Sequence, residues 1–173
     1  YALSILKYNG NFVLKIYDIF NKTTLQCIYL LSSLFKNIKI FKPKTSRSAN
    51  SEKYIICSQL TYTDEQKIKL IEKFYKILKV YNNMQGTYFI NSFLDINIQH
   101  YFINKVQEIN SILGNYQIKN ILTTMKLIEN NEKKNDKICS FKNDNIHKCI
   151  NWCVKNNIPY NTKYKPTNIF RKI

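Results

Sequence analysis

The stretch NGNFVLKIYD, residues 9–18, decides the fold expected for this chain of 173 residues. Residues 12–17 carry β-branched, aromatic and aliphatic side chains on both alternating faces, which is typical of a strand buried on both sides of a parallel sheet. Gly10 supplies the turn before it. Lys15 is the exception, because a charged amine in a doubly covered strand is costly unless it is paired or opens into a cleft.

Lys15 lies near the carboxyl end of this strand, where open α/β sheets place their ligand crevices. For the strand taken alone, a lysine at a sheet edge, with a buried stem and its head in water, is the more common case. The following residues alternate in type. They predict a helix at about 25–36, a strand at 37–42, a polar basic loop at 42–52 and a strand at 53–57. This order is that of an α/β sheet.

These residues, NGNFVLKIYD, then a helix, then FKPKTSRSANSEKYIIC, resemble the last part of an FtsJ-like (RrmJ-type) RNA 2′-O-methyltransferase. The resemblance is closest to cap-specific mRNA members, including those of large DNA viruses. It implies a Rossmann-like fold that binds S-adenosylmethionine and a Lys-Asp-Lys-Glu catalytic tetrad. By motif, Lys15 matches the third member and Glu52 the fourth. Two positions depart from the family pattern: Asn9 replaces the usual Gly and Ser48 the usual Pro.

The resemblance implies an α/β fold class. Residues 1–60 are expected to be the C-terminal part of a Rossmann-like, SAM-dependent methyltransferase sheet, and residues 61–173 a mainly α-helical extension with an extended tail. The family's glycine-rich donor turn and the first two tetrad members are expected upstream of Tyr1. The three glycines, Gly10, Gly86 and Gly114, are too scattered to cradle a cofactor. We therefore expect the fragment alone neither to bind S-adenosylmethionine nor to be active.

Amphipathic patterns predict helices throughout the second part. Thr63 is the expected cap of the first helix, which runs to about Val80. Gly114 is the expected stop of the second. Further helices are predicted at 95–113, 117–129 and 144–155, with a loose connection at 130–141 and an extended tail at 158–173. The apolar stripes of these helices are expected to be buried against the sheet or against one another.

The charge favours a polyanionic partner, since 27 Lys and Arg residues against 11 Asp and Glu give a net charge of +16. The cluster Lys42, Lys44 and Arg47 in the loop is predicted to hold RNA phosphates. Arginine is rare in this chain, and its planar fork suits phosphate or base edges. The expected partners are RNA, most specifically a capped mRNA 5′ end, and the upstream half of the same enzyme.

Five cysteines without a framework spacing indicate a reducing compartment. Cys139, His147, Cys149 and Cys153 fit no standard zinc spacing, so no metal is expected. No apolar run is long enough to span a bilayer. The expected location is the cytoplasm, or a viral factory or virion for a viral protein, and the nucleus stays open.

Methyl transfer to a ribose 2′-OH needs an alkoxide-like oxygen. Lys15 can take the hydroxyl proton if its pKa is lowered, or it can stabilise the oxyanion as a cation, and the sequence leaves both roles open. Glu52 is interpreted as the group that orients Lys15 and the ribose. Two other functions also stay open: a non-catalytic RNA-binding scaffold, and a 2′-O-methyltransferase that acts on rRNA or tRNA.

Overall fold

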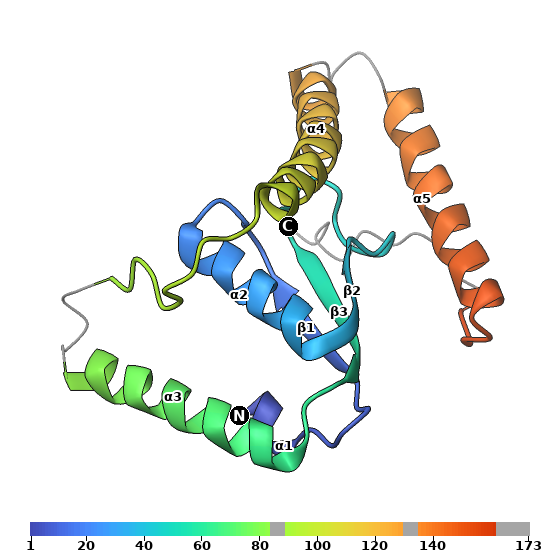
Figure 1. The fold of residues 1–173 in the computed structure, drawn as a ribbon. Helices are drawn as coiled ribbons and strands as arrows, with labels where there is room; N and C mark the ends of the chain where they lie inside the picture. The colour runs from blue at the N-terminus through green and yellow to red at the C-terminus, as the bar shows by residue number, and fades with distance from the viewer. Residues whose placement is uncertain (84–88, 130–134, 162–173) are drawn as a thin grey trace. The chain divides into compact units, whose positions relative to one another are not determined.

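The structure is a computed structural model that describes residues 1–83, 89–129 and 135–161. The chain divides into two compact units, residues 1–122 and 123–173. The boundary predicted at residue 60 separates the family-like segment from the helical extension. It does not describe compact units, and it stays a prediction. Figure 1 shows the order of the elements along the chain.

A three-stranded sheet forms the centre of the first unit. Its strands are β1 (Phe12–Ile16), β2 (Phe35–Phe41) and β3 (Lys53–Leu60), in the spatial order β1-β3-β2. β3 pairs antiparallel with both neighbours, with Lys15 opposite Tyr54 and Ile40 opposite Ile55. β1 and β2 therefore run parallel to each other. Their carboxyl ends lie at the same edge of the sheet as the amino end of β3.

This sheet confirms the α/β class and corrects two expectations about β1. Its only pairing among the described residues is antiparallel, and it is not buried on both faces. Its residues alternate between half-buried and exposed, and Val13 is 58% exposed. This alternation is characteristic of an antiparallel strand that is covered on one side. The run FVLKIY is apolar on both faces, so the sequence could not distinguish the two cases.

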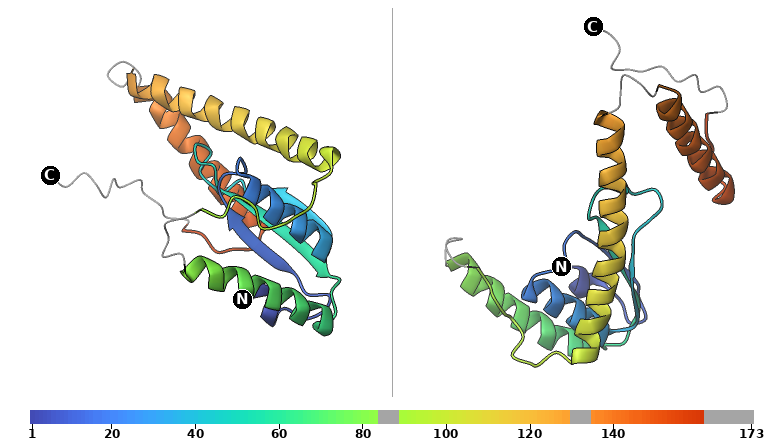
Figure 2. Two further views of the ribbon diagram at one scale, coloured as in Figure 1. Left: turned by 60° about the vertical axis from the view of Figure 1, so that its left-hand side comes forward. Right: turned by 90° about the horizontal axis from the view of Figure 1, so that it is seen from above.

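The covered face of the sheet packs against α2 (Lys22–Leu34), which lies beside the strands in Figures 1 and 2. Leu34 is fully buried and is the last residue of α2, and the chain enters β2 directly at Phe35. The Leu34 carbonyl accepts hydrogen bonds from the backbone N–H and the hydroxyl of Thr61, both at 2.9 Å. The junction between helix and strand is thereby tied to the end of β3. The buried core consists of Ile19, Ile28, Leu31, Leu34, Phe35, Ile55, Cys57, Leu60 and Val106.

A short helix α1 (Ala2–Ile5) contacts the long helix α3 (Asp64–Asn83). The predicted Thr63 cap is confirmed as a reciprocal capping box. The backbone N–H of Gln66 donates to the Thr63 hydroxyl at 3.4 Å, and the Gln66 amide oxygen accepts from the Thr63 N–H at 3.0 Å. Lys67 is buried and its ammonium pairs with Asp64 at 2.6 Å and donates to the Leu6 carbonyl. These contacts fix the start of α3 beside α1.

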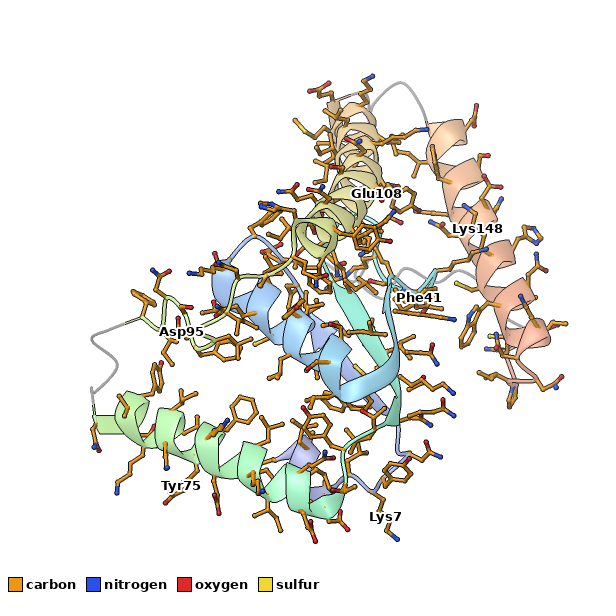
Figure 3. The ribbon with its side chains drawn as sticks, in the orientation of Figure 1. Lys7, Phe41, Tyr75, Asp95, Glu108 and Lys148 are labelled. Carbon is orange, nitrogen blue, oxygen red and sulfur yellow. The ribbon has the colours of Figure 1, made fainter. Side chains whose placement is uncertain are left out.

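The apolar stripe of α3 is only partly covered, contrary to the expectation of burial. Ile68, Tyr75 and Leu78 are exposed, whereas Ile71 and Phe74 are half-buried. The half-buried side chains line an apolar cavity of about 880 Å³, together with residues of α1, α2 and the segment before α4. Side chains project from α3 in Figure 3, where Tyr75 is labelled.

Gln26 on α2 is a fully buried polar side chain that holds the segment leading to the next helix. Its amide nitrogen donates to the Ser92 hydroxyl at 2.8 Å and to the Leu94 carbonyl at 2.9 Å. Its amide oxygen accepts from the Phe93 N–H at 3.0 Å. The next helix, α4 (His100–Glu129), packs Phe102 edge-on against Tyr29 of α2, with ring centroids 5.0 Å apart.

Two predictions about the later helices are wrong. Gly114 does not end a helix, because α4 continues through it to Glu129 and joins the two predicted segments. A mid-helix glycine costs only about 1 kcal/mol relative to alanine. The helical residues on both sides of Gly114 offset this cost. The last helix, α5 (Asn135–Lys155), begins well before residue 144, so part of the predicted loose connection is helical. The tail prediction falls mostly outside the described residues.

Within the described residues, no helix has the length and apolar character needed to cross a membrane. No group of three or more histidine, cysteine, aspartate or glutamate side chains gathers there in a way that could hold a metal ion.

Candidate active site

The structure brings Lys15 and Glu52 together at the sheet edge where β1 ends and β3 begins. The Lys15 ammonium lies 3.6 Å from a Glu52 carboxylate oxygen. Lys15 is 47% exposed and Glu52 is 17% exposed, so the pair is open on the lysine side. The antiparallel pairing of β1 with β3 explains the meeting, because it places the last residues of one strand beside the first residues of the other. The pair lies outside the apolar cavity at α3.

Tyr54 completes this cluster and was not predicted as a site residue. It lies opposite Lys15 in the pairing register, and its hydroxyl donates to the second Glu52 oxygen at 2.6 Å. The signal was present in the sequence, because a residue two positions after Glu52 on a strand points to the same face. On β1, Tyr17 lies two positions after Lys15, and the Lys15 ammonium is 5.4 Å from the centre of its ring.

These neighbours set the protonation of the cluster. A hydrogen bond with Tyr17 and the charge of Glu52 raise the pKa of Lys15. The hydrogen bond from Tyr54 and the charge of Lys15 lower the pKa of Glu52. The same bond to Glu52 raises the pKa of Tyr54. Near neutral pH the cluster therefore holds an ammonium, a carboxylate and a neutral phenol. Such an ammonium can stabilise a developing anion but has no free lone pair to accept a proton.

The loop between β2 and β3 carries the three predicted RNA-binding residues in two different environments. Lys44 and Arg47 are exposed. Lys42 is half-buried, and its ammonium donates to the carbonyl and side-chain oxygens of Asn50 at 2.7 and 2.9 Å and to the Glu52 carbonyl at 3.0 Å. An RNA phosphate would have to compete with these bonds at Lys42, whereas Lys44 and Arg47 are accessible.

The middle of α4 contacts this loop, a role for the helical extension that the sequence did not indicate. The Gln117 amide donates to the Ala49 carbonyl at 3.2 Å, and the hydroxyls of Ser48 and Tyr116 are 3.4 Å apart. Asn110 donates to the Ile19 carbonyl at 3.1 Å, just after β1. One helix thus supports both chain segments that leave the edge of the sheet at the Lys15–Glu52 pair.

The segment that contains the Lys15–Glu52 pair is similar to known proteins. Residues 1–60 match the model of the FtsJ-like methyltransferase family. Lys15, Glu52 and Tyr54 all lie inside this FtsJ-like segment, whereas α3, α4 and α5 lie beyond it. The segment is homologous over a short region to cap-specific mRNA 2′-O-methyltransferases.

Three relatives illustrate this similarity. The chain is 46% identical over 56 residues to "Cap-specific mRNA (nucleoside-2'-O-)-methyltransferase 1" of Drosophila melanogaster, covering 32% of this chain and 7% of the relative. It is 46% identical over 59 residues to the Mus musculus protein of the same name, covering 34% and 7%. It is 43% identical over 68 residues to "Cap-specific mRNA (nucleoside-2'-O-)-methyltransferase 2" of Danio rerio, covering 39% and 9%. The chain therefore matches less than a tenth of the length of each relative.

The departures of the FtsJ-like segment from the family pattern have local explanations. Asn9 has a φ of 63°, a left-handed conformation that glycine and asparagine adopt more readily than other residues. Its N–H donates to the Leu60 carbonyl, so the turn before β1 is held to the end of β3. Gly10 is required beside it, because a Cβ there would lie 2.7 Å from the Lys7 carbonyl oxygen. Ser48, in place of proline, places a hydroxyl near Tyr116.

FtsJ-like methyltransferases use S-adenosylmethionine, and the described residues do not form a cradle for it. Gly10 is packed against Leu6 and Lys7, and Gly114 lies within α4. Neither opens a loop whose backbone N–H groups could approach a ligand, and Gly86 lies outside the described residues. We therefore assign no donor-binding role to the described glycines.

Proposed function

We propose that the FtsJ-like segment supplies Lys15 and Glu52 for S-adenosylmethionine-dependent methyl transfer to a ribose 2′-OH of RNA, at the cap-proximal nucleotide of mRNA. The observation that carries this proposal is the 3.6 Å contact between the two residues that match the last members of the family's tetrad. The names of the relatives support the cap-proximal substrate.

The protonation of the cluster supports one of the two roles left open for Lys15. S-adenosylmethionine, when bound, would supply the methyl group to O2′, and the hydroxyl proton would pass to water. An ammonium aimed at O2′ stabilises the negative charge that develops there, and it does so most strongly in the transition state. Because its pKa is raised, Lys15 is charged and suited to this role. Glu52, held by Tyr54 on its other oxygen, fixes the direction of the lysine.

A chimeric enzyme tests the proposal. The segment of the Mus musculus relative that matches this chain would be replaced by residues 1–60, and methylated nucleotides would be measured by mass spectrometry in capped and uncapped RNA. We expect 2′-O-methylation of the first nucleotides of the capped RNA. Methylation of both RNAs alike would argue against cap specificity. A folded chimera that binds the donor but transfers no methyl group would contradict the catalytic proposal.

A non-catalytic role in RNA binding is the second candidate, and the exposed cations Lys44 and Arg47 in the loop between β2 and β3 favour it. The chimera separates the two functions, because a scaffold would retain RNA binding and show no transfer. Adding rRNA and tRNA to the substrates of the chimera tests whether one of them is methylated in preference to capped mRNA.

The exposed pair Lys44 and Arg47 is proposed to contact RNA phosphates. Replacing both with Ala in the 173-residue chain should reduce the log–log salt slope of single-stranded RNA binding by roughly 1.4, or about 0.7 for each phosphate contact. Lys69→Ala with Lys73→Ala is the matched control, since it removes the same charge from exposed positions on α3. Equal changes in both double variants would mean that RNA responds to net charge alone.

A further inference from the structure

Two lysines on either side of Glu52 direct their ammonium groups into the backbone and away from solvent. Lys53 is 5% exposed, and its ammonium donates to the Tyr17 carbonyl at 2.8 Å and to the Ser51 carbonyl at 3.0 Å. Lys42 reaches across the loop from β2 to Asn50 and Glu52. Burying a charge is costly unless acceptors replace its water, and both lysines have such acceptors.

Lys42 acts on Glu52 along two routes. Its bond to the Glu52 carbonyl fixes the backbone directly. It also holds the Asn50 side chain, whose oxygen accepts from the Glu52 N–H at 3.3 Å and whose amide donates to the Glu52 carboxylate at 3.4 Å. An ammonium has three N–H donors, and the three shortest bonds of Lys42 occupy all of them. Lys42 therefore closes the loop by bonding to Asn50 and Glu52, and the Glu52 carboxylate lies where the loop ends.

Lys53 connects the two strands of the site. The Tyr17 carbonyl follows the end of β1, two residues after Lys15, and the Ser51 carbonyl precedes Glu52. One ammonium therefore spans the gap between the segment that carries the lysine of the pair and the segment that carries the carboxylate. Burial lowers the pKa of both Lys42 and Lys53.

We propose that Lys42 and Lys53 are positioning residues that clamp the backbone around Glu52 and hold its carboxylate at Lys15. The catalytic part of this role rests on the proposed methyl transfer, whereas the clamp itself concerns the loop alone. The clamp assigns to Lys42 a function different from that of its neighbours Lys44 and Arg47, whose side chains are exposed. It also explains why a loop of polar residues can hold a carboxylate in one place.

Nuclear magnetic resonance of the complete 173-residue chain tests the clamp without any methyl transfer. Lys42→Met keeps the length of the side chain and removes its donors, and Lys44→Met is the control with the same loss of charge in the same loop. In Lys42→Met we expect the pKa of the Glu52 carboxyl to rise towards its ordinary 4.5. We also expect the amides of Ser51 and Glu52 to become mobile on the nanosecond scale. Lys44→Met should change neither.

Two outcomes would overturn the clamp. One is a raised pKa of Glu52 with rigid Ser51 and Glu52 amides, because this would show a through-space effect of charge without any positioning. The other is identical behaviour of Lys42→Met and Lys44→Met. Lys53→Met is the second variant, and we expect it to loosen the same amides if it folds. Lys42 is half-exposed, so the decisive test uses Lys42→Met and does not depend on replacing the buried Lys53.

The chimera adds a functional readout. Lys42→Met should lower kcat by about 10- to 100-fold through misplacement of Glu52 and leave the KM for RNA unchanged. A raised KM with unchanged kcat would assign Lys42 to RNA binding and contradict the clamp. If the wild-type chimera transfers no methyl group, the proposed function fails, while the resonance experiment still decides whether the clamp exists.

Discussion

Lys15→Ala should lower methyl transfer by the chimera by about 10²- to 10⁴-fold, with donor binding and the fold unchanged. The reason is the placement of Lys15, whose charged ammonium projects from the exposed face of β1 and is aimed by Glu52. Removing this cation would withdraw stabilisation from the oxyanion. It would leave the packed core unchanged, because Lys15 is exposed. Single-turnover rates with saturating donor and RNA measure the loss.

Lys39→Ala is the matched control for this variant. Lys39 is an exposed lysine on β2, paired in register with Ile56 of β3, and its loss removes the same charge from the same sheet. Its transfer rate should stay near that of the parent chimera. If Lys15→Ala retains more than about a tenth of the parent kcat, which is less than 1.4 kcal/mol of barrier, Lys15 is a structural residue.

Lys15→Arg distinguishes the two chemical roles. Arginine keeps the positive charge and does not give up its proton near neutral pH, so it can replace a cation but cannot replace a base. The raised pKa of Lys15 leads us to expect measurable activity from this variant, well above that of Lys15→Ala. Activity as low as that of Lys15→Ala would contradict the cation role.

Leu34→Ala should lower the free energy of unfolding of the first unit by about 3–5 kcal/mol. Leu34 is fully buried in the core at the point where α2 becomes β2, and its carbonyl is tied to Thr61. The loss therefore comes from a cavity in the core, at a junction that has no loop to relax into the space. Urea unfolding followed by far-ultraviolet circular dichroism measures the change.

Leu122→Ala is the control for the core variant, because Leu122 is half-exposed on α4 and its truncation should change stability by about 0.5 kcal/mol or less. Equal effects of the two variants would mean that the core packs differently from the structure described.

The sequence predicted the contact in the site better than the sheet around it. Lys15 and Glu52 could be paired because a specific motif contains both. The direction of β1 could not be predicted, since a run of apolar residues on both faces fits a covered parallel strand as well as an exposed edge. Only the pairing register shows that Tyr54 lies opposite Lys15 and that the strands are antiparallel.

Lys42 and Gly114 show two further limits. A lysine in a polar loop resembles any solvated lysine until the chain folds back and brings carbonyls eight to ten residues away onto its ammonium. Gly114 resembles a helix stop because glycine is common there, but the cost of one glycine is small beside the packing of a helix as long as α4. The Lys42 bonds depend on how the loop folds, and the helix at Gly114 depends on the helical residues on both sides of it, so neither could be read from one position.

The coupling between Lys15 and Glu52 tests the central claim most directly. The transfer rates of the parent chimera, Lys15→Ala, Glu52→Ala and the double variant form a thermodynamic cycle. Since Glu52 acts through Lys15, we predict that Glu52→Ala loses less than Lys15→Ala, and that the double variant is no slower than Lys15→Ala alone. If the two losses instead multiply in the double variant, the residues act independently, and the account of a working Lys15–Glu52 pair is contradicted.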